Sequence, residues 1–344
     1  GTGKSLASLW AYDYLRSIGQ MNKALVISPL STLERTWADE IFQHFPHLTY
    51  TVLHGAKDKR IKLLKEDFDV YIINHDGVGI IEPHLKDRTD IDLVIVDEIA
   101  QCARNASTTR WRKINTVVNK HKAPRACWGM SGTPTPNAPT DAWAQCRLVV
   151  PDAVPPYFNR FKGQVMKQLS QFQWIAKKGA TETVREVMQP SVRFTRDECL
   201  DLPPLMYETR QVPLTKDQGK AYKEMLTKLR LQAEEGDITA VNEAVKMGKL
   251  VQIACGVVYA PDGTEVTIPA TPRVEETRSI CHSAQGKVIV FVPYVSSVNM
   301  VAEELSKDFT VEIIHGGVKK DERDRIFAAF QKAKDPKVLV AQPA

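Results

Sequence analysis

The stretch that decides the fold is Leu93-Val94-Ile95-Val96-Asp97-Glu98, an apolar run that ends in two adjacent carboxylates. Such a run is typical of a strand that is buried on both faces of a parallel sheet. Because ligands bind beside the carboxyl ends of these strands, Asp97 and Glu98 are predicted to face a ligand crevice. The alternative is that the strand ends in acids simply because the following loop is exposed to water.

Gly1-Thr2-Gly3-Lys4-Ser5, at the start of the chain, matches the last part of a phosphate-binding loop, G-x-x-x-x-G-K-[ST]. Backbone N–H groups of such a loop, together with the helix after it, form an anion site for nucleotide phosphates. A glycine-rich turn with an ordinary surface lysine is the alternative. The acids follow this loop by about 90 residues, which is the order that a P-loop ATPase requires.

These two motifs predict an ATP site with bound Mg²⁺. We expect residues Gly1 to Ser5 to bind the phosphates of ATP, with Lys4 neutralising their charge. The hydroxyl of Ser5 and the carboxylate of Asp97 are the expected magnesium ligands, Asp97 acting through water. Glu98 is expected to polarise the attacking water, so Lys4, Asp97 and Glu98 are the candidate catalytic residues.

Over residues 1–150, short β-branched runs alternate with helical patterns, which predicts a doubly wound α/β domain. The expected strands are Ala24–Ser28, Tyr50–Leu53, Asp69–Ile73, Leu93–Val96 and Ala126–Met130. The expected helices are Ser5–Ile18, Ser31–His44, Lys57–Glu66, Thr108–Asn119 and Ala138–Val149.

The rest of the chain predicts a basic helical elaboration over residues 151–210 and a second α/β lobe with a helical insertion over 211–344. Expected helices are Lys216–Ala233, Ile238–Cys255, Ser296–Ser306 and Lys319–Lys332, and expected strands are Met206–Pro213, Val288–Val292, Thr310–Ile314 and Val338–Val340. Because the first motif lacks its opening glycine and the last strand ends the chain, we expect the sequence to be a fragment.

The chain has 344 residues and a formal net charge of +5, with enough apolar residues for two domains. Residues 155–196 carry eight basic side chains and two acidic ones, a local charge of +6. The basic residues are Arg160, Lys162, Lys167, Lys177, Lys178, Arg185, Arg193 and Arg196, and among them lie Tyr157, Phe158, Phe161, Phe172, Trp174 and Phe194. This mixture suits contacts with phosphates, sugars or bases. A solvated helical face with its own aromatic core is the alternative.

The cysteines are widely scattered and form no C-x-x-C pair, which predicts reduced thiols in a cytosol rather than a metal site. They are Cys102, Cys127, Cys146, Cys199, Cys255 and Cys281. No apolar stretch approaches the roughly 20 residues that span a bilayer, so we expect no membrane partner. The sequence therefore predicts a soluble intracellular protein.

Taken together, the motifs resemble those of Swi/Snf-type superfamily-two helicases, in the same order along the chain. Gly1–Ser5 resembles motif I, Asp97-Glu98-Ile99-Ala100 resembles motif II, and Ser131-Gly132-Thr133-Pro134-Thr135-Pro136-Asn137 resembles motif III, S/T-G-T-P-x-x-N. Ala24–Ser31 with Trp37 and Glu40 is similar to motif Ia, Lys287–Phe291 to motif IV, His315-Gly316-Gly317 with Arg323 to the next block, and Val338–Gln342 to the start of motif V. Thr133–Asn137 with Asp141-Ala142-Trp143-Ala144-Gln145, and Gln189–Pro204, resemble phage-borne members of the group in particular.

The resemblance implies two RecA-like parallel-sheet lobes, the second incomplete, with a helical insertion between them. It implies a DNA-dependent ATPase that uses ATP and Mg²⁺ to translocate along double-stranded DNA in the cytoplasm of a bacterial or phage-infected cell. Ser131, Gly132 and Thr133 are then expected to couple the ATP site to movement. The residues expected along the DNA backbone are Pro29, Ser31, Asn74, His75, His315, Gly316 and Gly317. Protein partners are not identified by the sequence.

Motif II departs from the family pattern at Ile99 and Ala100, where the family has Ala or Gly and then a polar residue. One polar contact between the ATP site and motif III is therefore expected to be missing. The motif that supplies an arginine finger is expected beyond residue 344, so the isolated chain is expected to hydrolyse ATP weakly or not at all. A degenerate ATPase that binds nucleic acid or a partner is the alternative function. A P-loop small-molecule kinase explains less, because it needs neither motif III nor a second lobe.

Overall fold

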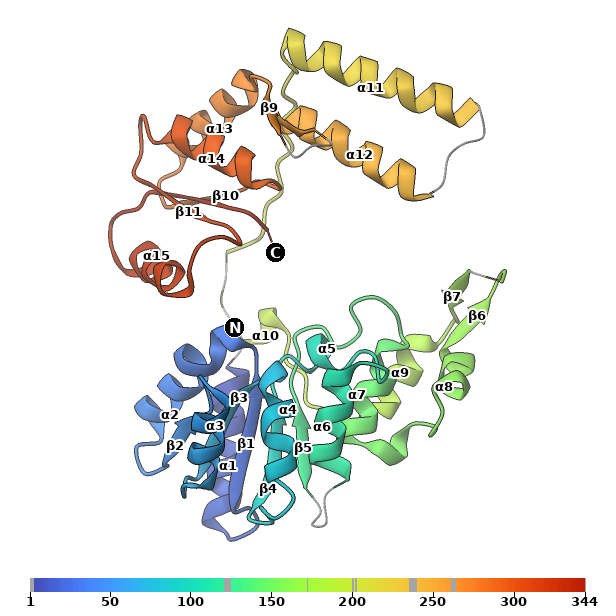
Figure 1. Cartoon of the computed structure of the whole chain (residues 1–344), viewed down its shortest axis with the longest axis vertical. Helices are drawn as coiled ribbons and strands as arrows, with labels where there is room; N and C mark the ends of the chain where they lie inside the picture. Colours follow the sequence, from blue (N-terminus) through green and yellow to red (C-terminus); the bar gives the residue numbers. More distant parts are fainter. Residues whose placement is uncertain are drawn as a thin grey trace. The chain divides into compact units, whose positions relative to one another are not determined.

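A computed structural model describes residues 3–120, 125–171, 173–199, 201, 203–234, 240–260 and 264–343. The chain divides into two compact units, Gly1–Pro204 and Leu205–Ala344, called unit 1 and unit 2 (Figure 1). None of the described helices is both long enough and apolar enough to cross a membrane.

Unit 1 is built on a parallel sheet whose described strands follow the order β2-β3-β1-β4-β5. Their bounds are β1 Lys23–Ser28, β2 Tyr50–Val52, β3 Val70–Asn74, β4 Ile91–Val96 and β5 Ala126–Gly129. Each neighbouring pair runs parallel. Parallel neighbours need crossover connections, and helices supply most of them here. The acid-ended strand β4 therefore lies between β1 and β5.

Side chains of this sheet alternate between two covered faces. Leu25 and Ile27 of β1 lie in the core cluster that includes residues of α3, α4, α6 and α7. Ala24 and Val26 lie in the other cluster, with residues of α1 and α2. Burial on both faces explains the unbroken apolar runs of the strands. These helices are α1 Lys4–Ser17, α2 Asp39–His44, α3 Lys57–Lys65, α4 Val78–Ile81, α5 Ile99–Cys102, α6 Thr109–Asn119 and α7 Asp141–Val149.

The segment predicted as one helix over Ser31–His44 is broken into three parts. A 3₁₀ turn at Leu30–Thr32 leads into a π-helical segment, Leu33–Ala38, and only then into α2. A π-helical turn is wider than an α-helical one and is frequent at functional sites. Here it carries Trp37, which is fully buried.

After α7 the chain forms a small structure that we call the insertion module, residues 158–187. It consists of α8 Phe158–Val165, an antiparallel hairpin of β6 Met166–Gln168 and β7 Trp174–Ala176, and α9 Ala180–Val187 (Figure 1). Phe161, Val165 and Val184 share a core cluster with Trp143 of α7. The prediction of a helical elaboration missed this hairpin, and a further short helix, α10 Arg196–Cys199, follows. The predicted boundaries near residues 150 and 210 stay a prediction.

Unit 2 contains a second parallel sheet whose described strands follow the order β10-β12-β11. One face is covered by α13 and α14 and the other by α15. The bounds are α13 Thr271–Ser283, α14 Val295–Leu305, α15 Lys320–Lys332, β10 Val288–Phe291, β11 Val311–Ile314 and β12 Val338–Ala341. The prediction of parallel-sheet α/β units is thus confirmed.

Before this sheet, unit 2 has a pair of helices that contact each other, α11 Lys216–Glu234 and α12 Ala240–Cys255, and a hairpin of β8 Val257–Tyr259 and β9 Glu265–Thr267. The strand predicted at Met206–Pro213 is wrong, because these residues have no regular structure. Met206 and Tyr207 are 85% and 89% exposed, and no neighbouring strand pairs with the segment among the described residues. An extended segment without a pairing partner does not become part of a sheet.

The close approach of β5 to α5 gives a test of this fold. A Cβ atom on Gly129 would lie 2.7 Å from Ile99 Cδ1 and 3.1 Å from Val149 Cγ2. Overpacking of this kind costs about 1–3 kcal/mol, so Gly129→Val is expected to lower the free energy of unfolding by that amount in urea titrations. Gly132→Val is the control, because a Cβ there meets no atom within 4 Å. Equal stability of the two variants would contradict the packing described.

Candidate nucleotide-binding site

The first helix begins at the residues that the sequence assigns to phosphate binding. Gly3 has a left-handed backbone, with φ 73° and ψ 22°, and α1 starts at Lys4. Glycine adopts this conformation without the strain that a side chain would cause. The first N–H groups of a helix have no partner within it, and with the helix dipole they attract anions. Gly1 and Thr2 lie outside the described residues, so their placement stays a prediction.

The acid pair follows directly after β4, between two other strands. The N–H of Asp97 donates to the Ile27 carbonyl of β1 at 2.8 Å, and the N–H of Met130 donates to Val96 at 2.9 Å. Glu98 then has φ 47° and ψ 48°, the one non-glycine residue with positive φ in the described chain. For an ordinary side chain this conformation costs on the order of 1–2 kcal/mol. Strain of this kind is concentrated at functional sites.

The carboxylate of Asp97 is buried, with 6% of the residue exposed. Its Oδ2 accepts a hydrogen bond from Trp37 Nε1 at 3.1 Å, and its Oδ1 accepts one from the backbone N–H of Glu98 at 3.0 Å. Among the described side chains, none forms an ion pair with it. A buried negative charge without a cation is unfavourable. The carboxylate oxygens themselves fit a bound Mg²⁺, which prefers carboxylate and phosphate oxygens, and the two N–H donors orient them.

Lys4 and Glu98 bring the helix start and the acid pair together. Lys4 Nζ lies 4.0 Å from Glu98 Oε1, and both side chains are about one-third exposed, at 37% and 35%. A pair this exposed contributes little to stability. The contact nevertheless places the candidate phosphate-binding lysine beside the candidate catalytic acid. Ser5 is half-buried in the first turn of α1, one residue further along.

Met130, the residue directly after β5, also contacts the candidate nucleotide-binding site. Ser8 of α1 donates to the Lys4 carbonyl at 2.9 Å, and its Oγ lies 2.8 Å from Met130 Sδ. The Met130 carbonyl accepts the N–H of Ile99 at 2.9 Å. Ile99 is 3% exposed and packs against Gly129. The unusual residues of motif II therefore connect to the strand before motif III by a backbone hydrogen bond and apolar packing.

The motif III residues Ser131, Gly132 and Thr133 follow β5 at the same edge of the sheet. The N–H of Thr133 donates to Ser131 Oγ at 3.2 Å, and Gly132 and Thr133 are exposed. The Gln145 side-chain amide of α7 donates to the Pro134 carbonyl at 2.6 Å. This bond fixes the loop after motif III to a helix of the core.

The predicted nucleic-acid residues of unit 1 differ in exposure. Ser31 is exposed and Pro29 is half-buried, in the turn after β1. Asn74, at the end of β3, accepts a hydrogen bond from Arg60 Nη1 at 3.2 Å. His75 is 7% exposed, so the structure does not present it at the surface as the prediction required.

His75 instead supports the acid pair. Its Nε2 lies 2.9 Å from the backbone carbonyl of Asp97, and because a carbonyl only accepts, the ring is protonated at Nε2. Burial lowers the pKa of His75 below its usual value. The neighbouring Asp76 pairs with Arg110 of α6 at 2.6 Å. Sequence reasoning missed this supporting role, since a histidine after an apolar strand carries no sign of its own burial.

In unit 2, the predicted residues His315, Gly316 and Gly317 form the turn after β11. Gly317 donates its N–H to His315 Nδ1 at 3.1 Å, and a Cβ on Gly317 would lie 3.0 Å from His315 Cε1. Because a side chain at position 317 would lie so close to the His315 ring, this position favours glycine. Gly316 is exposed, and no atom lies within 4 Å of a Cβ built on it.

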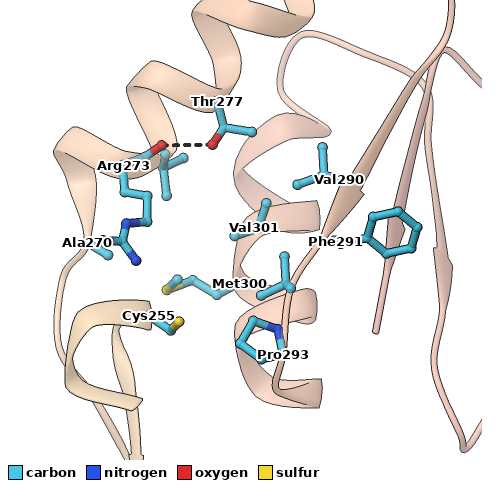
Figure 2. A pocket seen from close by; sticks show the side chains of 11 residues that line it. Cys255, Ala270, Arg273, Thr277, Val290, Phe291, Pro293, Met300 and Val301 are labelled. Carbon is cyan, nitrogen blue, oxygen red and sulfur yellow. Dashed lines mark hydrogen bonds between the residues drawn. The ribbon is translucent and has the colours of Figure 1, made fainter. Parts of the chain in front are cut away.

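Unit 2 also holds a cavity of about 150 Å³ (Figure 2). Cys255, Arg273 and Met300 border it, with Phe291 of β10 and residues of α14. Its lining includes no Asp or Glu and no phosphate-binding loop. The cavity therefore lacks the groups that a magnesium nucleotide needs.

A phosphate-binding helix start beside an acid-ended parallel strand is the arrangement of a P-loop nucleotide-hydrolysing protein. Residues 1–255 match the SNF2-related domain, and residues 273–344 match the helicase conserved C-terminal domain. The chain belongs to the SNF2-related family of helicase-like ATPases.

Known relatives are similar at low identity. The putative protein p41 of Acyrthosiphon pisum secondary endosymbiont phage 1 is 26% identical over 84% of this chain and 66% of its own length. The putative ATP-dependent helicase/translocase YwqA of Bacillus subtilis is 22% identical over 100% of this chain and 38% of its own length. The Sulfolobus solfataricus SWI2/SNF2 ATPase core in complex with dsDNA is 21% identical, with TM-score 0.48, over 99% of this chain and 71% of its own length. The chain thus spans less than two-thirds of the two curated relatives named here.

The burial of His75 predicts a specific dependence of stability on pH. Because its pKa is lowered in the folded state, the unfolded chain binds more protons below about pH 6.5, and stability falls as the pH falls. His75→Gln keeps a donor but does not titrate, so its free energy of unfolding should fall less between pH 7 and pH 5 in urea titrations. Replacement of the exposed His84 by Gln is the control and should keep the wild-type slope. A wild-type slope in His75→Gln would contradict the burial of this ring.

Proposed function

We propose that the protein is an ATP-driven motor that translocates along double-stranded DNA. The observation that supports this most is the buried carboxylate of Asp97, which has no ion-pair partner among the described residues. The next residue, Glu98, lies 4.0 Å from Lys4 Nζ at the start of α1. A site of this composition suits a magnesium-bound triphosphate, whose cation would lie against Asp97 and whose phosphates would lie against the helix start. Bound Mg²⁺ would supply charge neutralisation on the phosphates.

The chain's own residues then divide the work of hydrolysis. Lys4 neutralises phosphate charge, and Ser5 offers its hydroxyl to the metal ion. Glu98 is half-exposed and next to Lys4, so it is placed to accept a proton from water. Trp37 and the N–H of Glu98 orient the Asp97 carboxylate, and His75 holds the backbone behind it.

To move along DNA, the protein must transmit structural changes at the ATP site to the residues that contact DNA. Ile99 and Met130 connect motif II to Ser131, Gly132 and Thr133 through one backbone hydrogen bond. The proposed DNA track uses Pro29, Ser31 and Asn74 in unit 1, and His315, Gly316 and Gly317 in unit 2. Contacts of this type hold the sugar-phosphate backbone without reading sequence, which suits a translocase.

The cytoplasm of a bacterial or phage-infected cell stays the proposed location. All six cysteines are free thiols in the structure, as a reducing compartment would keep them.

The first test compares single substitutions at the ATP site in the full-length protein. Lys4→Ala should abolish DNA-stimulated ATP hydrolysis, and Glu98→Gln should keep ATP binding but lower kcat by about 100-fold or more. Hydrolysis is measured as phosphate release with and without linear duplex DNA. Lys65→Ala, at an exposed lysine on α3, is the matched control and should keep the wild-type rate.

Two results would contradict the proposed function. One is a wild-type rate that no DNA increases, which would favour the degenerate nucleic-acid- or partner-binding module. The other is a Lys4→Ala variant with an unchanged rate, which would mean that ATP is hydrolysed elsewhere.

A further inference from the structure

The insertion module carries positive charge that the structure does not neutralise. It contains six basic residues, Arg160, Lys162, Lys167, Lys177, Lys178 and Arg185, and two acidic ones, Glu182 and Glu186. Within the described part of the chain, none of these six cations forms an ion pair. Elsewhere in unit 1, Arg110 and Lys113 do pair with acids, at 2.6 Å and 2.8 Å. The charge of the module is therefore available to an external anion.

Three exposed cations come from three different parts of the module. Lys167 is on β6, Lys178 follows β7, and Arg185 is on α9, and all three are exposed. The hairpin of β6 and β7, which carries Lys167, extends outward from α8 and α9 (Figure 1), and Lys178 lies in the turn between β7 and α9. Separate elements thus present cations on one small structure, as a surface that follows a charged backbone requires.

The aromatic residues of the module that the structure describes, Phe158, Phe161 and Trp174, all contact other side chains. Lys162 Nζ lies 3.7 Å from the centre of the Trp174 ring, and Phe161 is fully buried in the core. Phe158 packs edge-to-face against Trp143, with ring centres 5.6 Å apart. Proteins that hold single strands stack bases on free aromatic faces. Only Phe158 of these three rings is exposed, at 40%, and its contact with Trp143 leaves little free face for a base, which favours contact with a phosphate backbone over base stacking.

A groove in the same unit continues this surface. Its volume is about 700 Å³, and its lining extends from Arg104 and Asn105, after α5, to Asn137 and to Phe158 of α8. Arg104 is exposed and has no hydrogen-bond or ion-pair partner among the described residues. The one carboxylate of the lining, Asp141, accepts the N–H groups of Asn137 and Ala138. The groove therefore connects the end of motif III with the insertion module through a lining rich in donors.

We propose that this groove and the insertion module form a second DNA-contact surface, which binds the phosphate backbone of duplex DNA without nucleotide. The proposal rests on the proposed function, because a motor must keep hold of DNA while ATP is absent. The surface consists of other residues than the proposed track at Pro29, Ser31 and Asn74, and it would add affinity that is independent of DNA sequence.

The test neutralises Lys167, Lys178 and Arg185 in the full-length protein and measures the salt dependence of DNA binding. The variant is Lys167→Gln/Lys178→Gln/Arg185→Gln, and binding to a fluorescent 20-base-pair duplex is followed by anisotropy across a salt series without nucleotide. Each lost phosphate contact lowers the slope of log K against log salt by about 0.9, so we expect a slope smaller by about 2–3 and binding about tenfold weaker. Arg104→Gln is the second variant and should lower the slope by about 1.

The control changes the same number of exposed cations, three lysines, at the opposite edge of the sheet. Lys62→Gln/Lys65→Gln/Lys86→Gln alters residues that precede β3 and β4, whereas Asp97 follows β4. This variant should keep the wild-type slope and affinity. Thermal unfolding at the wild-type midpoint shows for each variant that the protein is folded.

An unchanged slope in both the triple variant and Arg104→Gln would overturn the proposal, as would a loss of affinity confined to single-stranded DNA. Measuring DNA-stimulated ATP hydrolysis by the wild type distinguishes a failure of this proposal from a failure of the proposed motor function. If DNA stimulates ATP hydrolysis but the variants keep the wild-type slope, the proposed motor function is supported and the second DNA-contact surface is rejected. If the slope falls in the variants but DNA never stimulates hydrolysis, the second DNA-contact surface is supported and the proposed motor function is rejected.

Discussion

The carboxylate of Asp97 is buried at the end of β4, and the described residues supply neutral donors to it rather than a cation. Three local features position this carboxylate and its backbone. The π-helical segment turns Trp37 toward it, the left-handed backbone of Glu98 supplies an N–H to it, and His75 holds the carbonyl of the same residue. Because burying an unpaired charge is unfavourable, the proposed function assigns a bound cation to this carboxylate.

The position of Asp97 at the end of a central strand connects the site to the rest of unit 1. The strand order places β4 between β1 and β5, so the backbone of Asp97 and of Val96 bonds to both neighbours. Ile99 takes the place of a residue that the family pattern leaves small, and Gly129 of β5 leaves room for it. Ile99 thus links motif II to the residues after β5 by apolar packing and a backbone hydrogen bond, while the polar contact expected to be missing at Ala100 stays a prediction.

Much of the fold could be predicted because its strands are buried on both faces and are apolar for that reason. The residues after β4 could be predicted because two adjacent acids at such a strand end are distinctive. Other features could not be read from the pattern. Met166-Lys167-Gln168 is too short and too charged to indicate a strand, and Met206–Pro213 has a strand-like composition without a pairing partner. Burial of His75 depends on packing that sequence spacing does not show.

The most direct test of the account is the magnesium dependence of ATP binding, measured by calorimetry without DNA. Wild-type protein should bind ATP more tightly with Mg²⁺ than with a chelator. Asp97→Asn should keep the affinity measured with the chelator but lose the gain from Mg²⁺, because the buried charge that attracts the cation is gone. If Asp97→Asn gains as much affinity from Mg²⁺ as the wild type does, the central role of this carboxylate is contradicted.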